Sequence, residues 1–170
     1  TDAGNYSLTQ PSYLAANVTA KALTISGVSA ANKVYDSTTA ATLSGGVLTN
    51  GATGASDNLF YSTDTLTLNT TTAGVFNNKN VGTGKAITTS GFSLSGTDAG
   101  NYSLTQPSYL AADVTAKALA ISGVSATNKY YDGTTIATLS GGELVGNATT
   151  TSDGKVYTGD SIDLSRTTVG

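Results

Sequence analysis

Residues 1–46 read TDAGNYSLTQPSYLAANVTAKALTISGVSAANKVYDSTTAATLSGG, and residues 97–142 read TDAGNYSLTQPSYLAADVTAKALAISGVSATNKYYDGTTIATLSGG. The second stretch begins 97 − 1 = 96 positions after the first, and only six of the 46 positions differ. A period of this length corresponds to a whole domain, because the units of solenoid proteins usually span ~20–50 residues. Beyond residue 142 the same register continues at lower identity, with Asp57, Tyr61 and Asp64 aligned to Asp153, Tyr157 and Asp160.

The repeat predicts how the chain divides into domains. If Lys21 opens a unit, residues 21–116 form one complete β-sandwich repeat. Residues 1–20 are then the C-terminal end of a preceding repeat, and residues 117–170 are the N-terminal part of the next one. We therefore expect a section of a longer tandem array, in which neighbouring repeats of the same polypeptide are partners. The choice of Lys21 as the first residue of a unit is arbitrary, because unit boundaries placed every 96 positions fit the repeat equally well wherever they start.

The composition excludes several classes of function. Charged residues make up 11% of the chain, against ~25% in an average domain, and the net charge is −3. No basic stripe of a nucleic-acid-binding protein is present, and no apolar run approaches the ~20 residues of a membrane span. The absence of Cys rules out disulfides and thiolate metal sites. Without His or Cys the usual general base and thiol nucleophile are missing, so we do not expect an enzyme.

Alternation of apolar and polar residues dominates the pattern. It is clear in TLTLN (65–69), FSLS (92–95), YSLT (102–105) and LAADV (110–114). Glycine-rich turn signals separate these runs, as at 45–46, 82–84 and 96–100. Short strands at roughly 8–12-residue spacing are typical of sandwiches and barrels. We predict an all-β fold of tandem Ig-like β-sandwich repeats with a 96-residue period.

The apolar faces of these strands predict a core and a stiff connection. Residues 114–119, VTAKAL, contain no glycine or turn pair, so the chain is expected to pass nearly extended from one unit to the next. Such a connection limits hinge motion and favours a rod of end-to-end domains. The predicted core residues are Leu66, Leu68, Val81, Phe92, Leu94, Leu104, Val114, Leu119 and Ile121.

A family resemblance adds to this reading. Residues 129–135 read KYYDGTT and are followed by ATLSG at 137–141, while residues 33–39 read KVYDSTT with Ser37 in place of the glycine. Together with NKNVG (78–82), GTDAGNY (96–102) and TAKAL (115–119), this pattern resembles the YDG-type repeat of large bacterial filamentous-haemagglutinin-like surface adhesins. Those repeats occur beside bacterial Ig-like (MBG-like) modules. The resemblance covers nearly the whole chain and implies a secreted or surface-displayed, β-rich structural module without an established active site.

The YDG signature itself is predicted to be a turn rather than a ligand site. Asp132 would accept hydrogen bonds from backbone N–H groups, and Gly133 would allow a positive φ. Tyr131 would pack its ring and leave its hydroxyl at the rim of the core. Ser37 in the other copy indicates that the turn does not require glycine.

Calcium is the only cofactor for which the sequence offers candidates. The motif around Asp98 combines a carboxylate with an amide, and Asp160 and Asp163 form the densest acidic group, with Asp153 nearby. Calcium sites usually use ~6–8 oxygen ligands and several carboxylates, whereas the acids here are sparse. A structural turn is therefore the preferred interpretation of Asp98. No catalytic or cofactor-binding residue is predicted.

Two further chemistries depend on proximity that the sequence does not reveal. Asp57 and Asp64 recur as Asp153 and Asp160, and a pair of carboxylates in a common cleft can hydrolyse glycosides. A Lys–Asn isopeptide crosslink would need a buried lysine, an asparagine and an acid together. Its candidates are Lys21, Lys79 and Asn80.

The leading functional prediction is a non-enzymatic stalk or spacer unit of a giant bacterial surface adhesin or extracellular filament. Repetition would set the distance at which a distal binding region is held outside the cell. One alternative is a glycan- or cell-surface-binding module that uses the divergent loops 50–62 and 149–158, which include Phe60, Tyr61 and Tyr157. A second alternative is a self-assembling filament subunit in which copies pair through edge strands.

Overall fold

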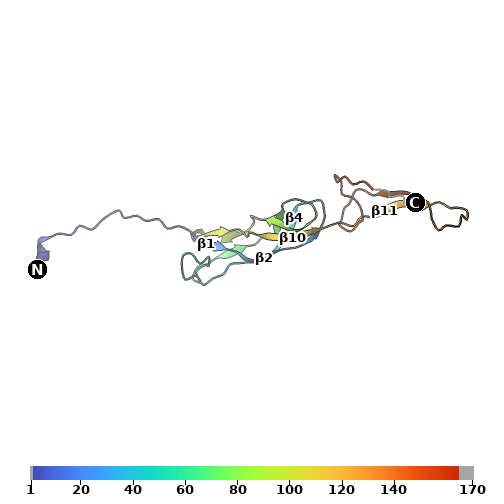
Figure 1. Ribbon diagram of the computed structural model, residues 1–170. Helices are drawn as coiled ribbons and strands as arrows, with labels where there is room; N and C mark the ends of the chain where they lie inside the picture. Colours follow the sequence, from blue (N-terminus) through green and yellow to red (C-terminus); the bar gives the residue numbers. More distant parts are fainter. Residues whose placement is uncertain (1, 165–170) are drawn as a thin grey trace.

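The computed structural model describes residues 2–164, which form an elongated molecule (Figure 1). A tail of residues 2–20 leaves one end of the molecule and contains only the short 3₁₀ helix η1 (Asp2–Asn5). Residues 21–116, called the central body here, contain strands β1 to β10. Residues 117–164, the C-terminal segment, lie at the other end and contain β11 and β12.

Twelve strands are assigned among the described residues, and the predicted all-β class is confirmed. Every predicted alternating run overlaps an observed strand. The strands are β1 (Lys21–Thr24), β2 (Ser26–Ala30), β3 (Lys33–Val34), β4 (Ala40–Val47), β5 (Thr67–Asn69), β6 (Ala73–Phe76), β7 (Gly82–Thr88), β8 (Ser93–Ser95), β9 (Tyr102–Thr105), β10 (Leu110–Thr115), β11 (Ile121–Ala126) and β12 (Leu139–Leu144), with a second 3₁₀ helix, η2 (Ala99–Asn101).

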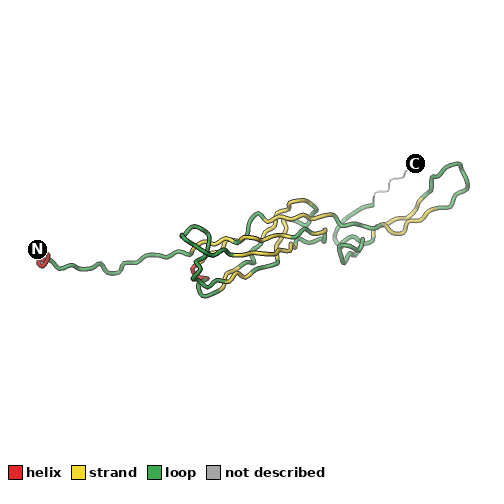
Figure 2. Tube along the Cα trace, turned by 90° about the horizontal axis from the view of Figure 1, so that it is seen from below, coloured by secondary structure: helices red, strands yellow, loops and turns green. Residues whose placement is uncertain are grey.

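The central body consists of three sheets whose strands run along the long axis of the molecule (Figure 2). The largest has six strands in the order β2-β4-β6-β7-β10-β3, and the pairs β1-β9 and β5-β8 form two-stranded sheets. Most neighbours are antiparallel, but β1 pairs with β9 and β3 pairs with β10 in parallel. The strands that begin and end the body are therefore each held by a parallel partner. No helix among the described residues is long and apolar enough to cross a membrane.

Alternation in the sequence determines which side chains are buried. In β6, Gly74 and Phe76 face inward, whereas Val75 between them is 51% exposed. The β2-β4 pair requires glycine at Gly45, which has a φ of +79°. A Cβ atom there would lie 2.2 Å from the carbonyl oxygen of Gly27, so any other residue would push the two strands apart. The same contact recurs in the C-terminal segment between Gly141 and Gly123.

The hydrophobic core lies in the central body. The prediction is confirmed for Phe92 and Val114, which are buried, while the predicted Leu66, Leu68, Leu94 and Leu104 are half-buried. Leu68 and Leu104 pack against the core cluster. Several core residues were not predicted because they stand in runs rich in Ala, Thr and Gly. The buried apolar residues are Leu23, Ala41, Leu43, Phe76, Ile87, Phe92, Tyr102, Ala112 and Val114.

Three predicted core residues are exposed, and these predictions were wrong. Val81 is 55% exposed because it lies in the turn before β7. Leu119 and Ile121 are 37% and 54% exposed, although Leu23, which precedes Leu119 by 96 positions, is fully buried. Leu23 lies in β1, which pairs with β9, whereas residues 117–120 belong to no strand of the structure.

Core packing at β6 gives a testable expectation. Phe76→Ala should lower the free energy of unfolding by about 3–5 kcal/mol, because Phe76 is 1% exposed and its loss leaves a cavity. The neighbouring Val75→Ala should cost less than about 1 kcal/mol, since half of that side chain is already in water. Urea denaturation followed by circular dichroism measures both. Equal losses for the two variants would contradict this account of the core.

Candidate functional site

The first residue of β1, Lys21, is fixed by the loop between β4 and β5. Its Nζ lies 2.5 Å from Asp57 Oδ1 and donates a second hydrogen bond to the carbonyl of Gly54 at 2.5 Å. The ammonium group also lies 5.5 Å from the centre of the Tyr61 ring, within cation–π range. Only 9% of the Lys21 side chain is exposed, so the charge is compensated almost entirely by the protein. We call this arrangement the lysine anchor.

The lysine anchor recurs 96 positions later in the C-terminal segment. Lys117 Nζ lies 2.7 Å from Asp153 Oδ1, donates to the carbonyl of Thr150 and lies 4.9 Å from the centre of the Tyr157 ring. The Lys117 side chain is only 3% exposed. Lys117 follows the last residue of β10, Thr115, by two positions, so this anchor fixes the chain where it leaves the central body.

Both anchoring carboxylates are also bound by their own loops. Asp57 accepts backbone N–H groups from Thr53, Gly54 and Leu59 at 2.8–3.1 Å. Asp153 accepts the equivalent groups from Thr149, Thr150 and Lys155. Hydrogen bonds from the lysine and the backbone hold the pKa of each carboxyl well below its usual range, so both stay ionised at neutral pH.

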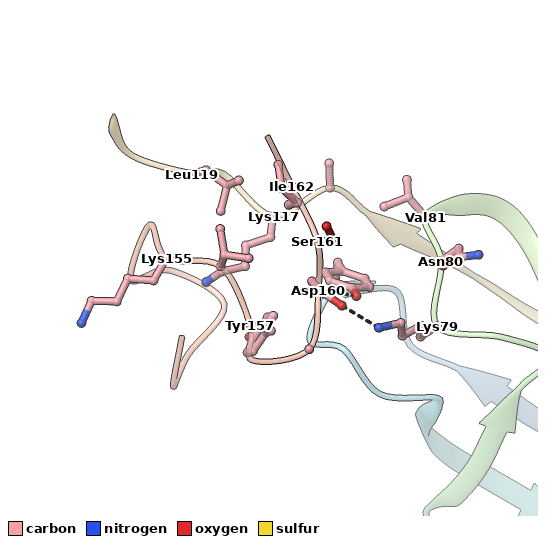
Figure 3. Close-up of a pocket in the computed structure, with 14 residues that line it drawn as sticks. Lys79, Asn80, Val81, Lys117, Leu119, Lys155, Tyr157, Asp160, Ser161 and Ile162 are labelled. Atoms are coloured by element: carbon pink, nitrogen blue, oxygen red, sulfur yellow. Dashed lines mark hydrogen bonds and ion pairs between the residues drawn. The ribbon is translucent and has the colours of Figure 1, made fainter. Parts of the chain in front are cut away.

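A second cluster joins the central body to the C-terminal segment, and we call it the junction cluster. Asp160 Oδ1 lies 2.6 Å from Lys79 Nζ, and Asp160 Oδ2 accepts the Tyr35 hydroxyl at 2.7 Å. Figure 3 shows the Asp160 carboxylate directed at Lys79. The ring of Tyr35 also meets that of Tyr157 edge to face, with centroids 6.0 Å apart. One carboxylate of the second repeat therefore binds two side chains of the first.

The electrostatics of the junction cluster are mutually reinforcing. The hydrogen bond from Lys79, followed by that from Tyr35, holds the pKa of Asp160 below its usual value. Asp160 and then Tyr35 raise the pKa of the Lys79 ammonium. The Asp160 side chain is 12% exposed and that of Lys79 is 40% exposed, so solvent screens the pair only on one side.

The chain between the two bodies is bound by contacts on both sides. The carbonyl of Thr115 accepts the N–H of Tyr35 at 2.8 Å, and Lys117 is held by its anchor. The N–H of Ala120 donates to the carbonyl of Gly154 at 2.8 Å. Only Ala116 separates the last fixed residue of the central body from the first fixed residue of the C-terminal segment. The connection between the two bodies is therefore short, and stiffness remains a prediction.

The YDG signature forms the predicted turn. Asp36 Oδ1 accepts the N–H and hydroxyl of Thr38, each at 2.9 Å, and Lys33 Nζ at 2.7 Å. Asp132 makes the same three contacts with Thr134 and Lys129. The residue after the aspartate has a positive φ in both copies, +65° at Ser37 and +73° at Gly133, so serine tolerates the conformation here.

The predicted packing of Tyr131 was wrong, since this side chain is 98% exposed. Tyr35, its counterpart 96 positions earlier, packs against the core and reaches Asp160. A tyrosine at this position is therefore covered when another repeat follows it. Tyr131 lies at the corresponding place on the C-terminal segment, where no further repeat stands against it in the described part of the chain.

The calcium candidates are dispersed rather than gathered. Asp98 accepts the N–H of Thr65 at 2.8 Å and so ties the turn before η2 to the residues just before β5. Asp160 is bound by Lys79 and Tyr35, and Asp163 is exposed. Residues 2–164 contain no group of three or more Asp, Glu, His or Cys side chains placed to hold a metal ion.

The candidates for glycoside hydrolysis and for an isopeptide crosslink are not brought together either. Asp57 binds Lys21, whereas Asp64 accepts the Tyr102 hydroxyl at 2.6 Å, so the two carboxylates have different partners. Lys21 and Lys79 both pair with aspartates, not with asparagines. The divergent loops carry the lysine anchors, and their aromatic residues are only partly accessible. Phe60 and Tyr157 are half-buried, and Tyr61 is 40% exposed.

Sequence reasoning named Lys79 and Asp160 for other roles but missed their contact. One signal was available, because the aspartate and tyrosine of loop 57–64 persist at 153–160 while the surrounding residues change. In the structure each of the persisting Asp and Tyr residues belongs to a lysine anchor or lies beside one. Tyr35 gave no such signal, since it lies in a region that is nearly identical in both copies.

These features define a class: an all-β repeat module whose charged contacts join consecutive repeats. The chain belongs to the YDG domain family, whose model matches residues 19–109 and again residues 115–170. The starts of the two matches differ by 115 − 19 = 96 positions. No curated protein and no solved structure is significantly similar to the chain.

The lysine anchor predicts a pH dependence. Because the pKa of Asp57 is lowered in the folded protein, its contribution to stability is fully present above the unfolded value of ~3.9 and is lost as the pH falls below that value. Asp57→Asn should therefore lose stability at neutral pH and show a shallower decline in acid than the wild type. Urea unfolding between about pH 7 and about pH 2 measures this.

The control for this experiment is Asp163→Asn, which removes the same charge from an exposed side chain. It should follow the wild-type curve. A parallel acid decline in Asp57→Asn and wild type would show that the lysine anchor does not contribute to stability.

Proposed function

We propose that the chain is a stalk segment of a giant secreted bacterial surface adhesin or extracellular filament, in which each repeat acts as a rigid spacer. The observation that carries the proposal is the double use of Asp160, which accepts Lys79 and Tyr35 of the preceding repeat. Two directional contacts from one carboxylate, with the edge-to-face ring pair beside them, oppose both bending and twisting at the junction.

The position of Asp64 supports the idea that the same contacts join every pair of consecutive repeats in an array. Asp64 precedes Asp160 by 96 positions, and the two residues close equivalent turns, with their N–H groups bound to Tyr61 O and Tyr157 O at 3.0 and 3.1 Å. Asp64 lines a pocket together with the end of the tail, residues 18–20. Asp64 accepts the Tyr102 hydroxyl within its own body, but a carboxylate can accept further hydrogen bonds. Each repeat would thus present Tyr35 and Lys79 at one end and, at the other, an aspartate with acceptor capacity left for the preceding repeat. Head-to-tail contacts of this kind generate an open, extended assembly when the rotation between units does not close a ring.

In this proposal the repeats are Ig-like β-sandwiches that follow one another every 96 residues and hold a distal binding region away from the cell. The structural role is supported by the contacts that join the two repeats. Neighbouring repeats are the partners, and calcium is not required. The glycan-binding alternative is less favoured, because Tyr157 of the divergent loop faces Tyr35 of the preceding repeat rather than solvent.

Small-angle X-ray scattering of the full chain tests the proposal. The wild type should scatter as an extended particle whose central body and C-terminal segment keep one orientation, with or without calcium. Asp160→Ala should broaden the distribution of interatomic distances, because it removes the acceptor for both Lys79 and Tyr35. The matched control Asp163→Ala, three positions away and exposed, should leave the scattering unchanged.

Two results would count against the proposal. If Asp160→Ala scatters like the wild type, the junction cluster does not hold the repeats in line. If calcium changes the wild-type profile, ion binding rather than side-chain pairing sets the shape. A polymer that grows with protein concentration would favour the self-assembling filament instead.

A further inference from the structure

The polarity of the strands that begin and end the central body points to a second mechanical property. β1 is the first strand of the body, and it pairs in parallel with β9 over four residue pairs, from Lys21↔Tyr102 to Thr24↔Thr105. β9 leads after four residues into β10, the last strand. The first and last strands of the body are therefore linked through β9, although the β1-β9 pair is a sheet of its own and β10 belongs to the six-stranded sheet.

The second parallel pair belongs to the six-stranded sheet. β3 pairs with the end of β10, with Val114 opposite Lys33 and Thr115 opposite Val34. The hydrogen bond from Tyr35 N–H to the Thr115 carbonyl extends this pairing by one residue. β3 belongs to the N-terminal part of the body and β10 to its C-terminal end, so here too early and late strands point the same way.

Tension along the stalk would load these pairs in shear. A pull on residue 20 draws β1 back toward its start, and a pull on residue 116 draws β9 and β10 forward. Inter-strand hydrogen bonds lie across the strands, so this sliding loads all bonds of a pair at once. If the force separated the strands from one end, the bonds would break one after another.

Side chains hold the sliding strands in register. Lys21, at the start of β1, is fixed by its anchor to Asp57, and Leu23 in the same strand is fully buried. Tyr102, at the start of β9, is buried, donates to Asp64 at 2.6 Å and accepts the N–H of Tyr61 at 3.1 Å. One loop, residues 53–64, therefore binds the starting residues of both strands. Val114 near the end of β10 is 1% exposed.

We infer that the parallel pairs β1-β9 and β3-β10 form a mechanical clamp that keeps each repeat folded under tension along the chain. We call these two pairs the terminal clamp. Resistance to tension is a different property from stiffness at the junction, because the clamp lies inside one body and involves neither Asp160 nor Lys79. A stalk that holds a binding region against a pull would need both.

Single-molecule force spectroscopy on the full chain separates the two loading directions. The natural chain contains no cysteine, so introduced pairs define the attachment points. Ala20→Cys with Ala116→Cys loads the clamp in shear. Ala20→Cys with Asn101→Cys pulls apart the adjacent starts of β1 and β9 and opens the pair sequentially. All three positions are exposed, so both variants should keep the wild-type circular dichroism spectrum and melting temperature.

The force at which the body unfolds should be several times higher in the shear geometry at the same pulling speed, because forced unfolding depends on the barrier along the pulled direction. Equal forces in the two geometries would overturn the inference. If the chain scatters as an extended particle but the unfolding forces are equal in the two geometries, the clamp is refuted and the stalk proposal stands. If scattering shows a flexible chain but the unfolding force is much higher in the shear geometry, the stalk proposal fails and the clamp stands.

A matched pair of leucine variants tests the same inference through the side chains. Leu104 in β9 and Leu68 in β5 are both half-buried against the core, but only Leu104 belongs to the terminal clamp. If the two alanine variants lose similar stability in urea, Leu104→Ala should lower the shear unfolding force more than Leu68→Ala. An equal drop in force would contradict the clamp.

Discussion

The burial of a lysine ammonium group at the start of each repeat is the constraint on which the rest of the structure depends. Lys21 and Lys117 lose almost all contact with water, so each must be compensated by a carboxylate and a carbonyl. The aspartates that compensate them are in turn fixed by three backbone N–H groups of their loops. The loop that would otherwise be the most variable part of the repeat is thereby made rigid where the chain enters the domain.

That rigidity has consequences on both sides of the loop. Within the central body, the loop holds the starts of β1 and β9 through Lys21 and Tyr102. Between bodies, the equivalent loop of the C-terminal segment carries Tyr157 and Asp160 to the preceding repeat. One element thus connects the fold of a repeat to its attachment. In a tandem array, this loop would contribute both to stiffness at the junction and, through the β1-β9 pair, to resistance to tension.

Much of the fold could be predicted from the sequence, but less of the site. Alternation predicted the strands, and the YDG turn followed from the ability of aspartate to bind its own backbone. The core was predicted only in part, since burial of Leu119 depends on strands that are distant in sequence, and its counterpart Leu23 was overlooked. In the junction cluster, Asp160 lies 81 positions after Lys79 and 125 positions after Tyr35. No local pattern in the sequence brings such distant residues together.

The central claim is that the junction cluster holds consecutive repeats in one orientation, and a distance measurement tests it most directly. Spin labels on cysteines introduced at Thr88 in β7 and Glu143 in β12, both exposed, would report the separation of the two bodies by pulsed electron paramagnetic resonance. The account predicts a single narrow distance distribution that broadens in Asp160→Ala. A broad distribution in the wild type would contradict it.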